Sequence, residues 1–221
     1  MGNVAKYQHG WNMTFTVVEL LMIIPKSTYL SISLPYFSIY HFFSLTLLLQ
    51  ILNEDMIEVL ESALQKAAGE GMDEFIQAFT DKYKEIIGGE LTAETMPLLT
   101  GEQHSLLAYQ IFRDEIMVGG FCQLIQNGYG GYIFDNPFAK VMRLWGAEEF
   151  SKLVYKAKKI FDSNRKDLEK ERTDDEFMAM YEQYEAFDDL EEAYLEMEEQ
   201  VTALIASYVD EHLELFAKII K

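Results

Sequence analysis

Apolar residues recur at helical spacing along most of the chain after residue 53. Between residues 72 and 87 they fall at offsets 0, 1, 4, 8, 11 and 12, and further stripes follow around residues 150–161 and 188–219. One face of a helix collects residues at such offsets, whereas a half-buried strand alternates every second residue. We find no convincing alternation of that kind, so the pattern predicts an all-α fold.

Short polar signals mark where these helices begin and end. Thr100 with Gln103, and Thr173 with Glu176, have the spacing of a capping box, in which each side chain binds the other's backbone N–H. Glycines favour chain reversal at helix ends and breaks within helices. Together these signals predict helices over 54–68, 72–87, 100–118, 121–126, 150–161, 173–184 and 188–219. They also predict a short helix with Pro137 in its first turn, capped by Asp135 or Asn136.

The predicted helices fit a single compact helical bundle of about six to eight helices over residues 53–221. Tyr129–Tyr132 reads as a loop, and residues 162–172, which mix charges of both signs, read as a linker. The last and longest predicted helix carries an apolar seam in steps of four and three, which is typical of a helix that packs along another at a small angle. The seam fits the core of one chain or a dimer contact.

Residues 1–52 form a hydrophobic N-terminal extension of different composition. No formally charged residue occurs from Ser27 to Asn53, which is long enough to cross a bilayer. Two prolines and several serines weaken that reading, and no cleavage motif of a signal peptide follows. Three interpretations stay open: a natural start at Met56 with translated upstream sequence before it, a membrane anchor over residues 27–53, or a cleaved signal.

Charge divides the chain more sharply than hydropathy does. The whole chain has 37 acidic and 18 basic residues. Residues 1–52 contain one acid, Glu19, and two bases, Lys6 and Lys26. Residues 53–221 therefore contain 36 acids and 16 bases, a net charge of −20. Such an excess disfavours direct binding to nucleic acid or anionic lipid and attracts basic partners.

The acids concentrate after Thr173. No base occurs between there and Ala217, and twelve acids lie between residues 174 and 199. If that span were one helix of about 38 Å, it would carry one charge per roughly 3 Å, near the 3.4 Å of a DNA strand. A plain solvated face is the alternative. The predicted acidic interaction surface comprises Asp174, Asp175, Glu182, Glu185, Asp188, Asp189, Glu191, Glu192, Glu196, Glu198 and Glu199.

Motifs for catalysis or cofactor binding are missing from the sequence. There is no phosphate-binding glycine loop followed by lysine, no dinucleotide fingerprint and no His-Glu-x-x-His. His104 is expected at the surface, and neither it nor His212 has the glutamate three residues earlier that a di-iron bundle requires. Cys122 is expected to be a buried apolar residue. We therefore predict no catalytic residue, no metal and no cofactor.

One polar pattern interrupts an apolar segment. Glu115, Gly119, Gln123 and Asn127 recur every four residues, and Gly120 and Phe121 complete the group. On a nearly continuous helix the first three share a face, and the glycines permit a break or a close approach. The group fits a hydrogen-bond network of the fold core. A small-molecule pocket, or a catalytic Glu115, is the alternative.

This pattern resembles the bacterial DNA-mimic protein family, with its Glu, three residues, Gly-Gly-Phe, one residue, Gln, and later Asn. Gly146-Ala147 also fits the start of the family's next helix. The resemblance implies a helical fold, often a homodimer, whose acidic surface imitates phosphates and occupies the DNA-binding face of a transcription regulator. Leu124 and Ile125 depart from it, because aromatic residues are expected there.

These observations predict a cytoplasmic, non-catalytic protein-interaction module whose partner is a basic protein, in particular a DNA-binding regulator. Two other functions stay open. The first is a small-molecule-binding or enzymatic bundle that uses Glu115, Gln123 and Asn127. The second is an acidic domain tethered to the inner membrane through residues 27–53.

Overall fold

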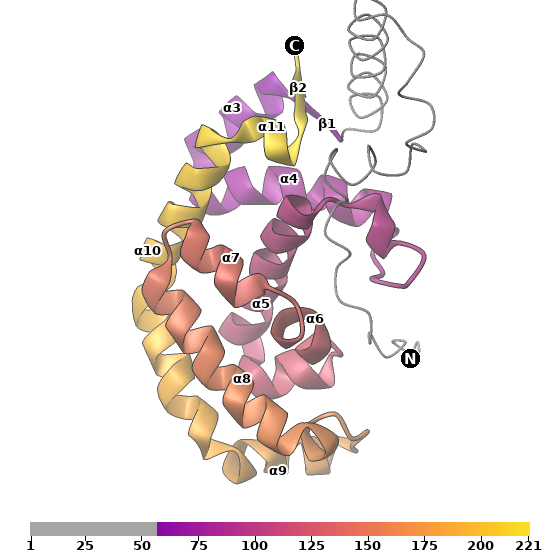
Figure 1. Cartoon of the computed structure of the whole chain (residues 1–221), viewed down its shortest axis with the longest axis vertical. Helices are drawn as coiled ribbons and strands as arrows, with labels where there is room; N and C mark the ends of the chain where they lie inside the picture. Colours follow the sequence, from indigo (N-terminus) through magenta and orange to yellow (C-terminus); the bar gives the residue numbers. More distant parts are fainter. Residues whose placement is uncertain (1–56) are drawn as a thin grey trace, which may run out of the picture.

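The computed structural model describes residues 57–221 as a bundle of helices around one long central helix (Figure 1). The described part contains nine α-helices, which confirms the all-α class. The count exceeds the predicted six to eight because two of them, α6 and α11, are short. In chain order the elements are β1 (Glu58–Leu60), α3 (Glu61–Glu70), α4 (Met72–Ile86), η2 (Met96–Leu98), α5 (Gly101–Gln126), α6 (Gly130–Phe134), α7 (Phe138–Leu144), α8 (Glu148–Leu168), α9 (Asp174–Gln183), η3 (Glu185–Phe187), α10 (Asp188–Glu211), α11 (Leu213–Phe216) and β2 (Lys218–Ile220).

Helix α5 is the centre of the packing. Helices α4, α6, α7, α8, α10 and α11 all contact it, and fifteen of its residues are buried. Aromatic rings fill the space around it: the Phe112 ring lies within 6 Å, centroid to centroid, of the rings of Phe121, Phe138, Phe150 and Tyr194. Most of these contacts are edge to face, the arrangement that ring quadrupoles favour.

Both predicted capping boxes are confirmed. The Thr100 hydroxyl accepts from the Gln103 backbone, and Gln103 accepts in return from the Thr100 backbone. Thr173 and Glu176 form the same pair at the start of α9. By contrast, neither Asp135 nor Asn136 caps α7, because the helix begins after Pro137 without a side-chain cap. That prediction was wrong.

The prediction that no strands occur was also wrong, at both ends of the described chain. Residues 58–60 form β1 rather than the start of a helix, and they pair in parallel with β2, with Val59 opposite Ile219. The last helix ends at Glu211 instead of continuing to 219. The Phe216 carbonyl accepts from Tyr83 Oη at 2.9 Å and from Gln103 Nε2 at 3.0 Å. These long-range contacts hold the chain end against α4 and α5.

Two further segments differ from prediction. Residues 130–134 form α6 rather than a loop, because Tyr132, Ile133 and Phe134 are buried against α5 and α8. Helix α8 continues through most of the predicted linker to the fully buried Leu168. Solvent-facing charges do not end a helix whose other face still has core to cover.

His104 is buried, not at the surface as predicted. Its side chain bonds Tyr132 Oη at 3.0 Å and the Met96 carbonyl at 2.8 Å, and burial lowers its pKa. Cys122 is buried as expected, and burial raises the pKa of its thiol to about 12.

The predicted extension, residues 1–52, and its alternative membrane span, residues 27–53, lie outside the described residues. Within residues 57–221, no helix has both the length and the apolar composition that crossing a bilayer requires.

Candidate protein-interaction surface

The break in α5 lies at the glycine pair, where the sequence placed it. Gly119 and Gly120 leave helical geometry, and Gly120 has φ +66°. This left-handed region is costly for residues with a Cβ. A Cβ at Gly120 would also collide with the carboxylate of Glu191 from α10. The positive φ favours glycine at residue 120, and a Cβ there would also have to displace the Glu191 carboxylate.

The polar residues of the motif bridge the two halves of α5. Glu115 Oε2 accepts from Gln123 Nε2 at 2.9 Å and from Asn127 Nδ2 at 2.8 Å, so one carboxylate before the break binds two amides after it. Glu115 and Gln123 are partly buried, and Asn127 is exposed. These contacts agree with the interpretation of the group as a network that holds the fold together.

The break also exposes backbone groups that form hydrogen bonds with α9 and α10. Phe121 N, freed by the break, donates to Glu191 Oε1 of α10 at 2.7 Å. The Gly119 carbonyl accepts from Tyr181 Oη of α9 at 2.9 Å. Burial raises the pKa of Glu191, and the bond from Phe121 N opposes that shift. The motif in α5 thus places α9 and α10 through backbone groups that an unbroken helix would have used internally.

Two hollows occur in the described structure away from this network. One of about 440 Å³ lies between the α6–α7 segment and α8, beside Asn136, Tyr155 and Lys158. The other, of about 200 Å³, lies beside Asp73 and Thr202. Neither is lined by Glu115, Gln123 or Asn127. Among residues 57–221 no cluster of His, Cys, Asp or Glu is arranged to hold a metal ion.

Nine of the eleven predicted surface acids are exposed. These are Asp174, Asp175, Glu182, Glu185, Asp188, Asp189, Glu192, Glu196 and Glu199. Asp189, Glu192, Glu196 and Glu199 follow offsets 0, 3, 7 and 10 and share the outward face of α10. None of the nine forms an ion pair with another described residue. We call these nine residues the acidic surface.

The remaining two predicted acids face inward. Glu191 binds the break in α5, as described above. Glu198 contacts Arg113 Nε at 2.5 Å, and Arg113 also contacts Asp73 Oδ2 at 2.6 Å. The Arg113 and Glu198 side chains are only 20% and 15% exposed, so this network joins α4, α5 and α10 in a partly dry environment. These two acids position α10 and add little to its open face.

The hydrogen-bond and ion-pair partners of Glu191 and Glu198 were not predicted from the sequence. Arg113 is the only base between Lys84 and Lys140, and a lone cation in an apolar helix was a usable signal. Tyr181 gave no such signal, because its hydroxyl meets a carbonyl 62 residues away.

Comparison with known proteins supports the resemblance. Residues 97–212, just over half of the chain, match the family model described as DMP19-like protein. The chain belongs to this family. It is 33% identical over 127 residues to the DNA mimic protein DMP19 of Neisseria meningitidis serogroup B, an alignment that covers 57% of this chain and 77% of that protein. The matched region of the family model includes α5, the break and the acidic surface.

Proposed function

We propose that this protein is a non-catalytic DNA mimic whose acidic surface occupies the DNA-binding face of a basic regulator. The observation that carries the proposal is the acidic surface itself: nine exposed carboxylates with no ion-pair partner among the described residues. The relative named as a DNA mimic supports the same role. Carboxylates held outward on helices offer basic side chains the contacts that phosphates offer.

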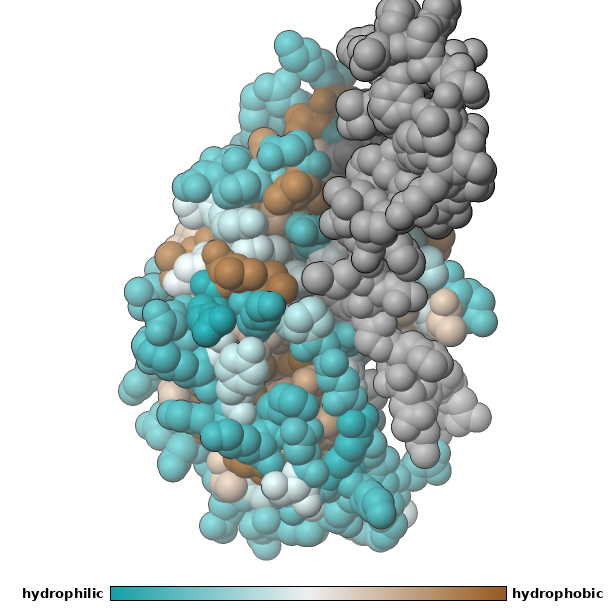
Figure 2. All heavy atoms as spheres, viewed as in Figure 1, coloured by the Kyte–Doolittle hydropathy of each residue, from teal (hydrophilic) through white to brown (hydrophobic). Residues whose placement is uncertain are grey.

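The geometry favours binding over chemistry. Glu115, the candidate catalytic acid of the alternative reading, already accepts two amide donors. His104 is buried and bonded on both ring nitrogens. Figure 2 shows hydrophilic residues over much of the visible face, including the region of α8 and the end near α9.

Competition by DNA tests the proposal. The protein is immobilised, loaded with lysate from the cells that produce it, and washed with duplex DNA or with buffer of equal ionic strength. We expect duplex DNA to release a DNA-binding protein, and gel-shift assays to show that the mimic displaces DNA from it. Affinity should fall steeply with salt.

A matched column carries the triple variant E192Q/E196Q/E199Q, which removes three exposed charges and no described contact. Equal retention on both columns, or release that does not depend on DNA, would contradict the proposal.

We also propose a cytoplasmic location and homodimer formation. The location follows from the proposed regulator partner, and the dimer from the family resemblance. Sedimentation of the purified protein, and fractionation of the cells, test these two points separately from the binding proposal.

A further inference from the structure

Helix α9 carries part of the acidic surface but has little apolar attachment. Of its ten residues only Met180 is buried, and Met178 is 64% exposed. Burial of this one side chain offsets only part of the conformational entropy that is lost when the ten backbone residues of α9 are ordered. Its capping box and helical bonds offset part of that cost. Phe177 and Tyr181 also pack against the core, but both are only partly buried, so the position of α9 depends on polar contacts as well.

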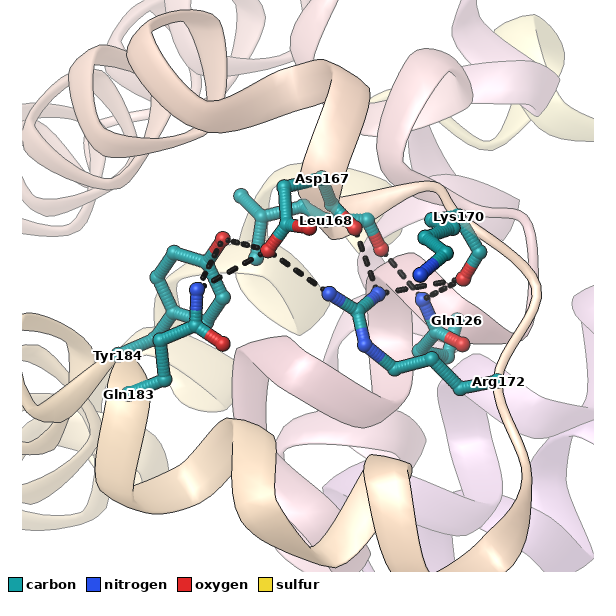
Figure 3. Close-up of polar contacts among 7 residues, drawn as sticks. All are labelled: Gln126, Asp167, Leu168, Lys170, Arg172, Gln183 and Tyr184. Atoms are coloured by element: carbon teal, nitrogen blue, oxygen red, sulfur yellow. Dashed lines mark hydrogen bonds and ion pairs between the residues drawn. The ribbon is translucent and has the colours of Figure 1, made fainter.

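One carboxylate oxygen of α8 receives contacts from both ends of α9 (Figure 3). Asp167 Oδ2 accepts from Arg172 at 2.8 Å, just before α9, and from Gln183 at 3.0 Å and Tyr184 at 2.5 Å, at its end. The hydroxyl of Tyr184 contributes most to a lowered pKa of Asp167. Three donors on one oxygen favour the ionised carboxylate.

Arg172, which donates to Asp167, also binds backbone carbonyls at the end of α8 and in the segment between α8 and α9. The Arg172 side chain is only 6% exposed, and its guanidinium donates to the carbonyls of Asp167 and Lys170, at 2.5 and 3.2 Å. Gln126 of α5 donates to the Leu168 carbonyl and to that of Lys170 (Figure 3). A nearly buried cation needs a charged partner, and Asp167 is the one that the structure gives it.

We infer that Asp167 is the positioning residue that holds α9, and with it Asp174, Asp175, Glu182 and Glu185, in place on the acidic surface. Tyr181, bonded to the Gly119 carbonyl, adds a third attachment between the two ends. The functional part of this inference rests on the proposed DNA mimicry. Its structural part does not.

Hydrogen exchange of the full chain tests the structural part without a ligand. In D167A we expect the α9 amides to exchange at least tenfold faster than in the wild type, with the amides of α5 unchanged. D167N keeps one acceptor oxygen but loses the charge that faces Arg172, so it should lie between the two. The control is D162N, which changes an exposed acid of α8 whose described partner is Lys158.

Unchanged α9 exchange in both Asp167 variants, with the rest of the domain folded, would overturn the inference. General loss of protection in D167A would leave D167N as the deciding variant.

Binding to the DNA-binding protein recovered by duplex elution tests the functional part. We expect D167A to weaken its affinity about three- to tenfold, D167N to restore part of the loss, and D162N to leave the affinity unchanged. If α9 is released yet affinity stays equal while E192Q/E196Q/E199Q weakens it, the functional role of α9 is refuted. If the triple variant also binds normally, the proposed function fails, and hydrogen exchange still decides whether Asp167 holds α9.

Discussion

Helices α8 and α10 lie side by side and both pack against α5 (Figure 1), yet α8 exposes charged residues of both signs, whereas the exposed charged residues of α10 are all acids. Exposed lysines follow α8 at helical spacing, namely Lys152, Lys156, Lys159 and Lys166, whereas α10 exposes acids and has no base. On α8, Lys152 and Lys158 pair with carboxylates of their own helix. No described ion pair joins an α8 lysine to the acidic surface.

This difference teaches that the core constrains only one side of each helix. The inward faces of α8 and α10 both contribute apolar side chains to the core. Their outward faces can carry charges of either sign as long as the protein stays soluble. Helix α10 has no base, and its exposed carboxylates form no ion pair with another described residue. Variants of the two helices and of the groups that hold them can test whether this difference in charge matters.

Substitution of Gly120 should disturb the contact between the break in α5 and Glu191 of α10. G120A places a Cβ in the left-handed region and against Glu191, so we expect the free energy of unfolding to fall by about 3 kcal/mol. Urea denaturation measures it. V118A changes an exposed residue beside the break and is the control. Equal stability of G120A and wild type would show that the break does not constrain α10.

Alkaline pH should loosen the contact between α5 and α10. Tyr109 Oη bonds Thr202 of α10 at 2.7 Å, and burial raises the pKa of Tyr109 to about 12. In the unfolded chain a tyrosine ionises near pH 10. Its folded-state contribution is therefore intact below pH 10 and is lost as pH rises from about 10 to 12, by roughly 2 kcal/mol.

Denaturation at pH 9 and pH 11 measures the first part of this loss, about 1.4 kcal/mol for the one pH unit above the unfolded pKa. Y109F removes the ionising group and should show a smaller decrease between the two pH values. The same decrease in both proteins would assign the effect to other groups.

Neutralisation of the outward face of α10 should affect binding more than folding. For E192Q/E196Q/E199Q we expect about tenfold weaker affinity for the regulator at low salt, since each exposed charge pair contributes about 0.2–1 kcal/mol. The free energy of unfolding should stay equal or rise slightly, because like charges are removed. Titration calorimetry and urea denaturation separate the two effects.

Neutralisation of the outward face of α8 completes the comparison. K156Q/K159Q/K166Q changes the same number of charges on the neighbouring helix, and we expect the affinity to stay within about twofold or to increase slightly. A decrease as large as that of the α10 variant would mean that the lysines also contact the partner.

Much of the site could be predicted because it depends on local patterns. The break at Gly119–Gly120, the capping boxes of Thr100 and Thr173 and the exposed acids of α10 all follow from residues within a few positions of each other. The roles of Glu191 and Glu198 could not be predicted, since both sit on the same helix as exposed acids. Their partners, Phe121 N and Arg113, lie 70 and 85 residues away.

The helical class, the position of the break and the uneven charge can be read from the amino-acid sequence, because periodicity, glycine conformation and net charge are properties of short segments or of composition. Only the tertiary structure decided that His104 is buried, that the chain ends in a strand paired with residues 58–60, and that Asp167 binds both ends of α9. These features depend on groups far apart in the chain meeting in a low-dielectric interior, where an unpaired polar group is costly. Which groups meet there is decided by packing.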